Sequence, residues 1–148
     1  MSQYVTVAQF FQYIPATIAD GTFITGASDT NGNVLNALIT ASGEADAHMR
    51  GRFNLPITGS VAGGPGVFDP AIVMRVCWIA AFNLMRGRGF NPVAIDTEIK
   101  TGYAEAIKWF EGVQRQSIHP DVVESTPDAP AHPFPSFTSA QPRGWNCQ

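Results

Sequence analysis

The chain has 148 residues and a formal net charge of −3, and 45 % of its residues are hydrophobic while only 14 % are charged. This length suits one domain with a substantial hydrophobic core. The negative net charge argues against a partner bound by overall charge attraction, such as nucleic acid or an anionic membrane. Soluble domains average about 25 % charged residues, so much of this surface is neutral, and we expect part of it to be buried in an assembly.

The two cysteines are predicted to be free thiols, because Cys77 lies in an apolar run and Cys147 is the next-to-last residue. Such a pair does not form a disulfide framework, and a reducing compartment is the simpler interpretation.

The N-terminus has no basic stretch followed by an apolar one, so we expect no secretory signal. The longest apolar run, residues 71–82, contains Arg75 and is too short to span a bilayer.

A short helix and a longer one are predicted in the N-terminal third. Thr6 and Gln9 have the spacing of a capping box, and Pro15 closes the helix that they begin. After a loop, Asp29 or Thr30 is expected to cap a second helix, which ends near Met49. Its predicted apolar face contains Val34, Leu35, Leu38, Ala41, Ala45 and Met49, and its predicted polar face contains Asn36, Ser42, Glu44 and Asp46.

Two further helices follow a glycine-rich segment. Residues 53–68 are too irregular for a helix, and their length predicts a hairpin or a functional loop. Asp69 and Pro70 suit the cap and the first position of a central, buried helix. The last helix is expected over about 96–116. Its apolar face contains Ile99, Tyr103, Ala106, Ile107, Phe110 and Val113.

The composition changes after residue 116. Six of the eleven prolines lie in residues 117–148, and this density forbids a helix and disfavours a central strand. We therefore predict an all-α fold: a small bundle of about four helices in a domain at 1–116 that includes the long glycine-rich loop, followed by an extended proline-rich C-terminal arm at 117–148. The arm carries Phe134, Phe137 and Trp145, which are expected to dock on a neighbouring molecule.

A near-repeat ends two of the predicted helices: MRGRFN at 49–54 returns as MRGRGFN at 85–91. The main interpretation is that these residues end their own helices. Arginine is favoured at the negative end of the helix dipole, and glycine permits a left-handed C-terminal turn. The functional alternative is that these arginines also form ion pairs with a partner.

No catalytic, metal or cofactor site is predicted. The loop at 59–66 lacks the Lys-Ser/Thr of a phosphate-binding loop, and no histidine has a partner at the spacing of a zinc site. Glu44 and His48 are one helical turn apart and are expected to form a surface pair. Cys77 has no adjacent base, and its apolar setting should raise the thiol pKa, so we assign it to the core.

Three blocks of the sequence, in order and at matching spacing, resemble the Mu-like phage head–tail connector family. They are GEADAHMRGRFNLPI (43–57), VCWIAAFNLM (76–85) and YAEAIKWFEGV (103–113). The first carries an acidic pair, then Gly-Arg-aromatic and Leu-Pro. The resemblance covers about residues 3–118, apart from the loop at 58–68. Ala45 and His48 stand where the family pattern has a larger apolar residue and an aromatic.

The resemblance implies a structural adaptor protein that is not an enzyme. Such adaptors form rings, commonly of twelve copies, between the portal and the tail, and DNA passes through the lumen without specific binding. The implied partners are further copies of the chain, the portal protein and a tail or neck protein, with no membrane. The implied location is the virion neck, assembled in the bacterial host cytoplasm.

The residues expected at interfaces follow from the near-repeat, the first block and the arm. Arg52 is expected either to cap its own helix or to pair with the next subunit. The complete set of interface candidates is Arg50, Arg52, Phe53, Leu55, Pro56, Arg86, Arg88, Phe134, Phe137 and Trp145.

Three alternatives stay open from the sequence. Another neck or tail ring, such as a tail terminator, would share the ring but bind on the tail side. A small helical metal-dependent enzyme would use Glu44, Asp46 and His48. A generic helical regulator would need a recognition helix rich in basic residues, which this sequence does not offer.

Overall fold

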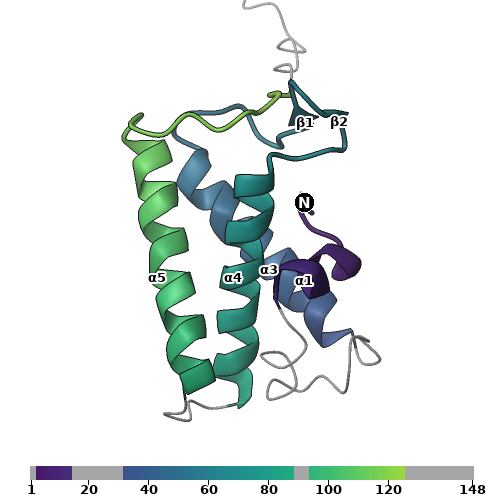
Figure 1. Ribbon diagram of the computed structural model, residues 1–148. Helices are drawn as coiled ribbons and strands as arrows, with labels where there is room; N and C mark the ends of the chain where they lie inside the picture. Colours follow the sequence, from purple (N-terminus) through teal and green to yellow (C-terminus); the bar gives the residue numbers. More distant parts are fainter. Residues whose placement is uncertain (1–2, 15–31, 89–93, 126–148) are drawn as a thin grey trace, which may run out of the picture.

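The computed structural model describes residues 3–14, 32–88 and 94–125, and its helices form the predicted small bundle (Figure 1). The helices are α1 (Val7–Tyr13), α3 (Asn33–Met49), α4 (Pro70–Arg88) and α5 (Ala94–Gln114). A hairpin in the glycine-rich loop consists of β1 (Gly59–Ser60) and β2 (Gly64–Pro65). Figure 1 shows α4 and α5 side by side, with α3 crossing behind them and α1 at its side. The predicted fold class is therefore confirmed.

The starts of α1 and α4 follow the capping rules that the sequence suggests. Thr6 Oγ1 accepts the N–H of Gln9 at 3.2 Å, and Gln9 Oε1 accepts the N–H of Thr6 at 2.9 Å, so the predicted capping box is present. Asp69 Oδ1 accepts the N–H of Ala71 at 2.8 Å, which confirms the predicted cap of α4. Both helix starts are thus encoded by side chains within a few residues.

The start of α3 differs from the prediction. The helix begins after Gly32, which has a left-handed backbone (φ 69°) and makes no side-chain cap hydrogen bond. Glycine occupies this conformation at little steric cost because it lacks a Cβ. A cap at Asp29 or Thr30 is therefore wrong, and both residues lie outside the described part of the chain. The predicted end of the helix at Met49 is confirmed.

The polar face predicted for α3 is wrong at Ser42, which is fully buried. The segment before α1 lies across α3 there: the N–H of Tyr4 donates to Ser42 Oγ at 3.3 Å, and the Tyr4 hydroxyl donates to Asp46 Oδ1. Leu35, which the periodicity places in the apolar face, is 38 % exposed. It is about 100° around the helix from the buried Val34.

Helix α4 is the central element of the core and packs against both α3 and α5. Helix α5 comes very near it at Gly102, where an added Cβ would lie 2.5 Å from the Trp78 ring. The Trp78 ring therefore needs a residue without a side chain at this position. The buried hydrophobic residues of the three helices are Val34, Ala37, Leu38, Ala41, Ala45 and Met49 in α3, Ile72, Val73, Val76, Cys77, Ile79, Ala80, Ala81, Leu84 and Met85 in α4, and Ile99, Ala106, Phe110 and Val113 in α5.

Neither Gly51 nor Gly87 makes the left-handed turn that the sequence predicts, and Gly89 lies outside the described residues. Gly51 has no positive φ. Helix α3 ends instead with the N–H groups of Arg52 and Phe53 donating to Met49 O at 2.9 Å and 3.0 Å. Gly87 lies inside α4. Two amides already satisfy the last carbonyl of α3, so no left-handed residue is needed there.

The hairpin and the chain after α5 close one end of the bundle (Figure 1). β1 pairs antiparallel with β2, and Gly59 also forms a bridge with Val123. The N–H of Val123 donates to Gly59 O at 2.8 Å, and Val123 O accepts the N–H of Thr58 at 2.9 Å. The first part of the predicted arm, 117–125, is therefore bonded to the loop. Residues 126–148 lie outside the described part.

Candidate interface surfaces

Arg52 joins the end of α3 to the end of α5. Its Nη1 donates to Val113 O at 2.8 Å and to Ile118 O at 2.6 Å, and its guanidinium lies 4.8 Å from the centre of the Phe53 ring. The last carbonyls of a helix lack partners within the helix and carry the negative end of its dipole, so a cation is favoured there. Arg52 thus caps α5. The expectation that it caps its own helix is wrong, and its pairing with a neighbouring subunit stays a prediction.

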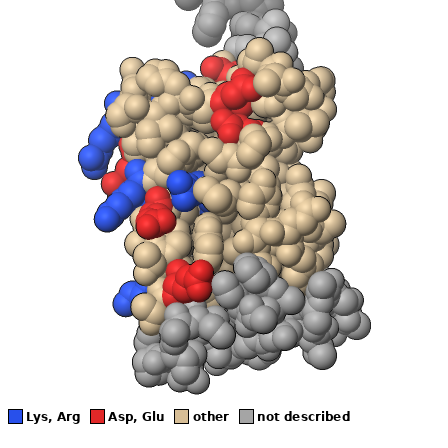
Figure 2. Space-filling view, viewed as in Figure 1, with Lys and Arg blue, Asp and Glu red and all other residues tan. Residues whose placement is uncertain are grey.

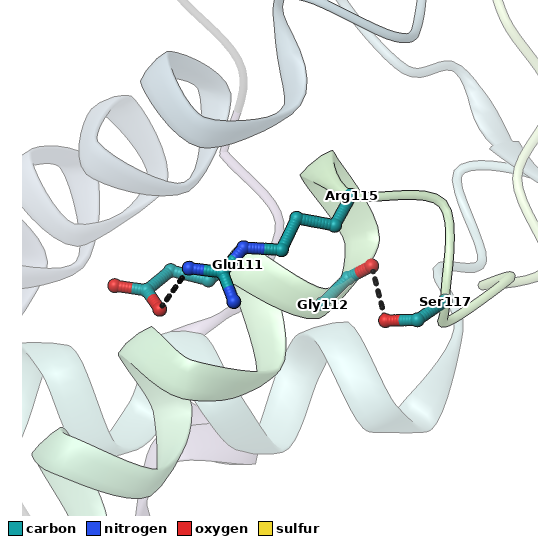
Figure 3. A network of polar contacts seen from close by, with 4 residues as sticks. All are labelled: Glu111, Gly112, Arg115 and Ser117. Carbon is teal, nitrogen blue, oxygen red and sulfur yellow. Dashed lines mark hydrogen bonds and ion pairs between the residues drawn. The ribbon is translucent and has the colours of Figure 1, made fainter.

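Further polar contacts close the end of α5 (Figure 3). The hydroxyl and the N–H of Ser117 both donate to Gly112 O, at 3.0 Å and 2.9 Å, while Gln116 takes the left-handed conformation with φ 62°. Arg115 and Glu111 form an ion pair at 3.6 Å, but the Arg115 side chain is 78 % exposed, so this pair adds little stability. Helix α5 therefore ends in a defined turn that leads the chain toward the hairpin.

Two carboxylates link α4, the chain after α5 and the turn of the hairpin. Asp69, which caps α4 with Oδ1, accepts the N–H of Asp121 with Oδ2 at 2.8 Å. Asp121 in turn accepts the N–H of Val61 with Oδ1 at 2.9 Å and the N–H of Ala62 with Oδ2 at 3.0 Å. Charge-assisted hydrogen bonds of this kind are stronger than neutral ones. The local sequence predicts the Asp69 cap but not the role of Asp121, because the partners of Asp121 are 59 and 60 residues away along the chain.

The hairpin end exposes three valines. The side chains of Val61, Val67 and Val123 are 75 %, 53 % and 39 % exposed, and Ala62 at the turn is exposed as well. We call Val61, Val67 and Val123 the valine tip. Single exposed apolar residues are ordinary, but a cluster of them indicates an interaction site.

A pocket of about 350 Å³ lies between α4 and α5, toward the opposite end of the bundle. We call it the basic pocket, because it is lined by Phe82, Met85, Arg86 and Lys100. Behind it, Phe82 stacks on Tyr103 with the ring centres 4.0 Å apart, and the Tyr103 hydroxyl donates to Glu44 Oε1 at 3.0 Å. Burial, followed by the charge of Glu44 and its hydrogen bond, raises the pKa of Tyr103. The hydrogen bond to Glu44 and the stacking on Phe82 hold the Tyr103 ring in place.

The interface candidates from the sequence do not gather in one patch. Arg50 and Pro56 are exposed at the hairpin end, Phe53 and Leu55 pack partly against the core, and Arg86 is exposed in the last turns of α4. Arg88 is the last residue of α4, and its side chain lies outside the description. Phe134, Phe137 and Trp145 lie outside the described residues. The interface role of these residues stays a prediction.

Glu44, Asp46 and His48, the residues of the enzyme alternative, each contact a different partner. Glu44 faces Tyr103 rather than the expected His48, while Asp46 binds the Tyr4 hydroxyl. The His48 ring stacks on Phe110 with the ring centres 6.1 Å apart, as the aromatic residue of the family pattern could do. Within 3–14, 32–88 and 94–125, no group of three acidic, histidine or cysteine side chains could hold a metal ion.

Cys77 is a core residue, as predicted. Its side chain is fully buried, and burial raises the pKa of its thiol to about 12. A thiol with this pKa is almost entirely protonated near neutral pH and is a poor nucleophile.

None of the helices described here combines the length and the apolar character required to cross a membrane.

Comparison with known proteins identifies one family. The model of a family described as "Bacteriophage Mu, Gp36" matches residues 4–137. This match spans the whole bundle, the hairpin, Asp121 and part of the predicted arm, and so extends beyond the region at 3–118 that carries the resemblance in the sequence. No curated protein matches the chain.

Proposed function

From the premise that this chain belongs to the bacteriophage Mu Gp36 family, we propose that it is a head–tail connector subunit, which forms a ring between the portal and the tail. The observation that carries the proposal is the family match over residues 4–137. Membership implies a phage structural or assembly protein, and the connector role is the specific function that we assign within that class.

The charge distribution supports a role in assembly. Figure 2 shows a broad area without charged side chains on one half of the molecule, while charged side chains of both signs lie along the opposite edge, over α5. Only 14 % of the residues are charged. A surface with so few charges loses little hydration when it is covered by a neighbour. The net charge of −3 also suits a lumen that DNA crosses without being held, because few counterions would be released.

The proposed partners are further copies of the chain, the portal protein and a tail or neck protein. Identical copies that associate through two different surfaces form a closed ring when a whole number of the rotations from one copy to the next makes a full turn. We assign Phe134, Phe137 and Trp145 of the arm to the contact with the portal or an adjacent subunit, since an arm with five prolines after residue 125 cannot bury these aromatics in a helix of its own.

The test is electron microscopy of particles assembled without this chain. We expect filled heads and free tails that fail to join, and a tagged copy should restore joined particles and add density at the neck. Joined, infectious particles without the chain would refute the connector role. A pull-down against portal and tail-tube proteins then separates a connector from a tail terminator, because a terminator would retain only the tail-tube protein.

A further inference from the structure

The valine tip protrudes at one end of the bundle, and the basic pocket is a hollow between α4 and α5 toward the other end. The tip projects from the end of the bundle where α4 begins (Figure 1), and Val61 is its most exposed side chain, at 75 %. A protruding apolar side chain loses contact with water only when another surface surrounds it. The partner surface must therefore be a concave apolar site.

The tip is rigid before it meets a partner. The Asp121 carboxylate accepts the N–H groups of Val61 and Ala62 at the turn. The Asp121 N–H in turn donates to the Asp69 carboxylate. The bridge from Val123 to Gly59 fixes the third valine relative to the other two. A preorganised protrusion loses little conformational entropy on binding, so even a small apolar contact can be effective.

Carboxylates lie beside the valine tip. Asp69, Asp121 and Glu124 all lie at this end of the molecule, and Glu124 Oε2 accepts the N–H of Asn54 at 2.9 Å. Their hydrogen bonds to backbone amides fix the carboxylates but do not neutralise them. Figure 2 shows acidic side chains grouped beside the uncharged hairpin end. The complementary partner surface should therefore carry positive charge around an apolar floor.

The basic pocket has this chemistry. Phe82 and Met85 form its apolar part, and the exposed Arg86 supplies a cation at its edge. It cannot be reached by the tip of its own chain, because α4 separates them: the tip lies at the start of this helix and Arg86 lies sixteen residues further on, about 24 Å along the axis. A contact between the two surfaces must join different copies.

We infer that the valine tip of one copy inserts into the basic pocket of the next, with the acidic residues beside the tip facing Arg86. The two surfaces are different, so the contact is head-to-tail and leaves each copy with one free tip and one free pocket. The inference rests on the proposed function only for the closure of this chain of contacts into a ring.

The first test measures self-association of the full chain by analytical ultracentrifugation over a range of concentrations. Val61→Arg places a cation against Arg86 and should weaken association at least about tenfold, and Arg86→Glu should do the same. The double variant pairs the two new charges and should recover to within about threefold of the wild type. Tyr13→Arg is the matched control, because Tyr13 is a 37 % exposed apolar residue on α1, and it should leave association unchanged.

The second test traps the contact with a disulfide bond between two introduced cysteines. In a Cys147→Ser background, Val61→Cys with Arg86→Cys should give a ladder of disulfide-linked oligomers under oxidising conditions, both at high protein concentration and in particles. Each single-cysteine variant should give none, and Val61→Cys with Tyr13→Cys is the control pair. No ladder under either condition, or an equal ladder from the control pair, would overturn the proposed contact.

The outcomes separate this inference from the connector role. A ladder from a protein that is absent from the neck would support the contact and reject the connector. A neck ring without the ladder would keep the connector and reject the contact. Normal association of Val61→Arg and Arg86→Glu would also reject it.

Discussion

Arg52 and Val113 lie 61 residues apart in the sequence, and a 2.8 Å hydrogen bond from the guanidinium to the carbonyl joins them. The same nitrogen also donates a hydrogen bond to Ile118 O at 2.6 Å. The bond sets the end of α3 against the end of α5, at the point where the chain turns toward the hairpin.

Replacing Arg52 by Met should lower the free energy of unfolding by about 2–3 kcal/mol, because partly buried carbonyls would lose a charged donor. Urea denaturation of the purified chain measures this change. Arg50→Met is the matched control, since Arg50 is exposed, and it should change stability by less than about 0.5 kcal/mol. Equal effects from both substitutions would show that the bonds to α5 add nothing.

Asp121→Asn should loosen the turn of the hairpin. One of the two carboxylate oxygens is replaced by an amide NH2 group, which cannot accept a hydrogen bond from the N–H of Val61 or Ala62. Hydrogen exchange at these two amides should speed up by an amount equivalent to about 1–3 kcal/mol of local stability. Exchange in the middle of α4 should remain unchanged. Glu105→Gln, at an exposed position of α5, is the control. Unaltered exchange at the turn would mean that Asp121 does not hold it.

Two truncations test how the chain after α5 contributes to the fold. A chain ending at residue 125 keeps the bonds of Asp121, Val123 and Glu124 to the loop, and a chain ending at 118 loses all of them. We expect the shorter chain to be less stable by at least about 3 kcal/mol. Thermal denaturation followed by circular dichroism compares the two. Equal melting temperatures would show that residues 119–125 only rest on the surface.

Substituting Gly102 by Ala should destabilise the bundle by about 1–3 kcal/mol, because the new methyl group would overlap the Trp78 ring and force the two helices apart. Gly43→Ala is the matched control within a helix, as a Cβ at that position meets nothing within 4 Å. That change should stabilise by about 0.5–1 kcal/mol through the higher helix propensity of alanine. Urea denaturation should therefore give opposite signs for the two substitutions.

The Cys77 thiol should resist modification in the folded protein. With a pKa of about 12, only about one thiol in ten thousand is ionised at pH 8. In a Cys147→Ser background, a thiol reagent should react at the rate of unfolding. The unfolded thiol ionises near 9.0 and the folded one near 12, so this group favours the folded state below pH 9 and loses its contribution as the pH rises toward 12. Rapid labelling at pH 8 without denaturant would contradict the burial.

Local sequence patterns predicted the elements whose signals lie within one or two helical turns. Thr6 with Gln9 marked the start of α1, and Asp69 with Pro70 marked that of α4. The apolar periodicity placed the core face of α5 correctly. These signals are short-range because capping and amphipathicity involve residues that are neighbours on the same helix.

Other features depend on residues that only the folded chain brings together. Ser42 is buried because Tyr4 crosses over it, and Arg52 finds its acceptors at the end of α5 and in the chain that follows it. Asp121, in the same segment after α5, bonds to the hairpin turn. The valine tip and the basic pocket are likewise each built from segments that are separate in the sequence. The sequence by itself determined the helices and the family resemblance. Tertiary structure decided which polar groups meet, because hydrogen bonds and pockets depend on distances in space that residue spacing along the chain does not encode.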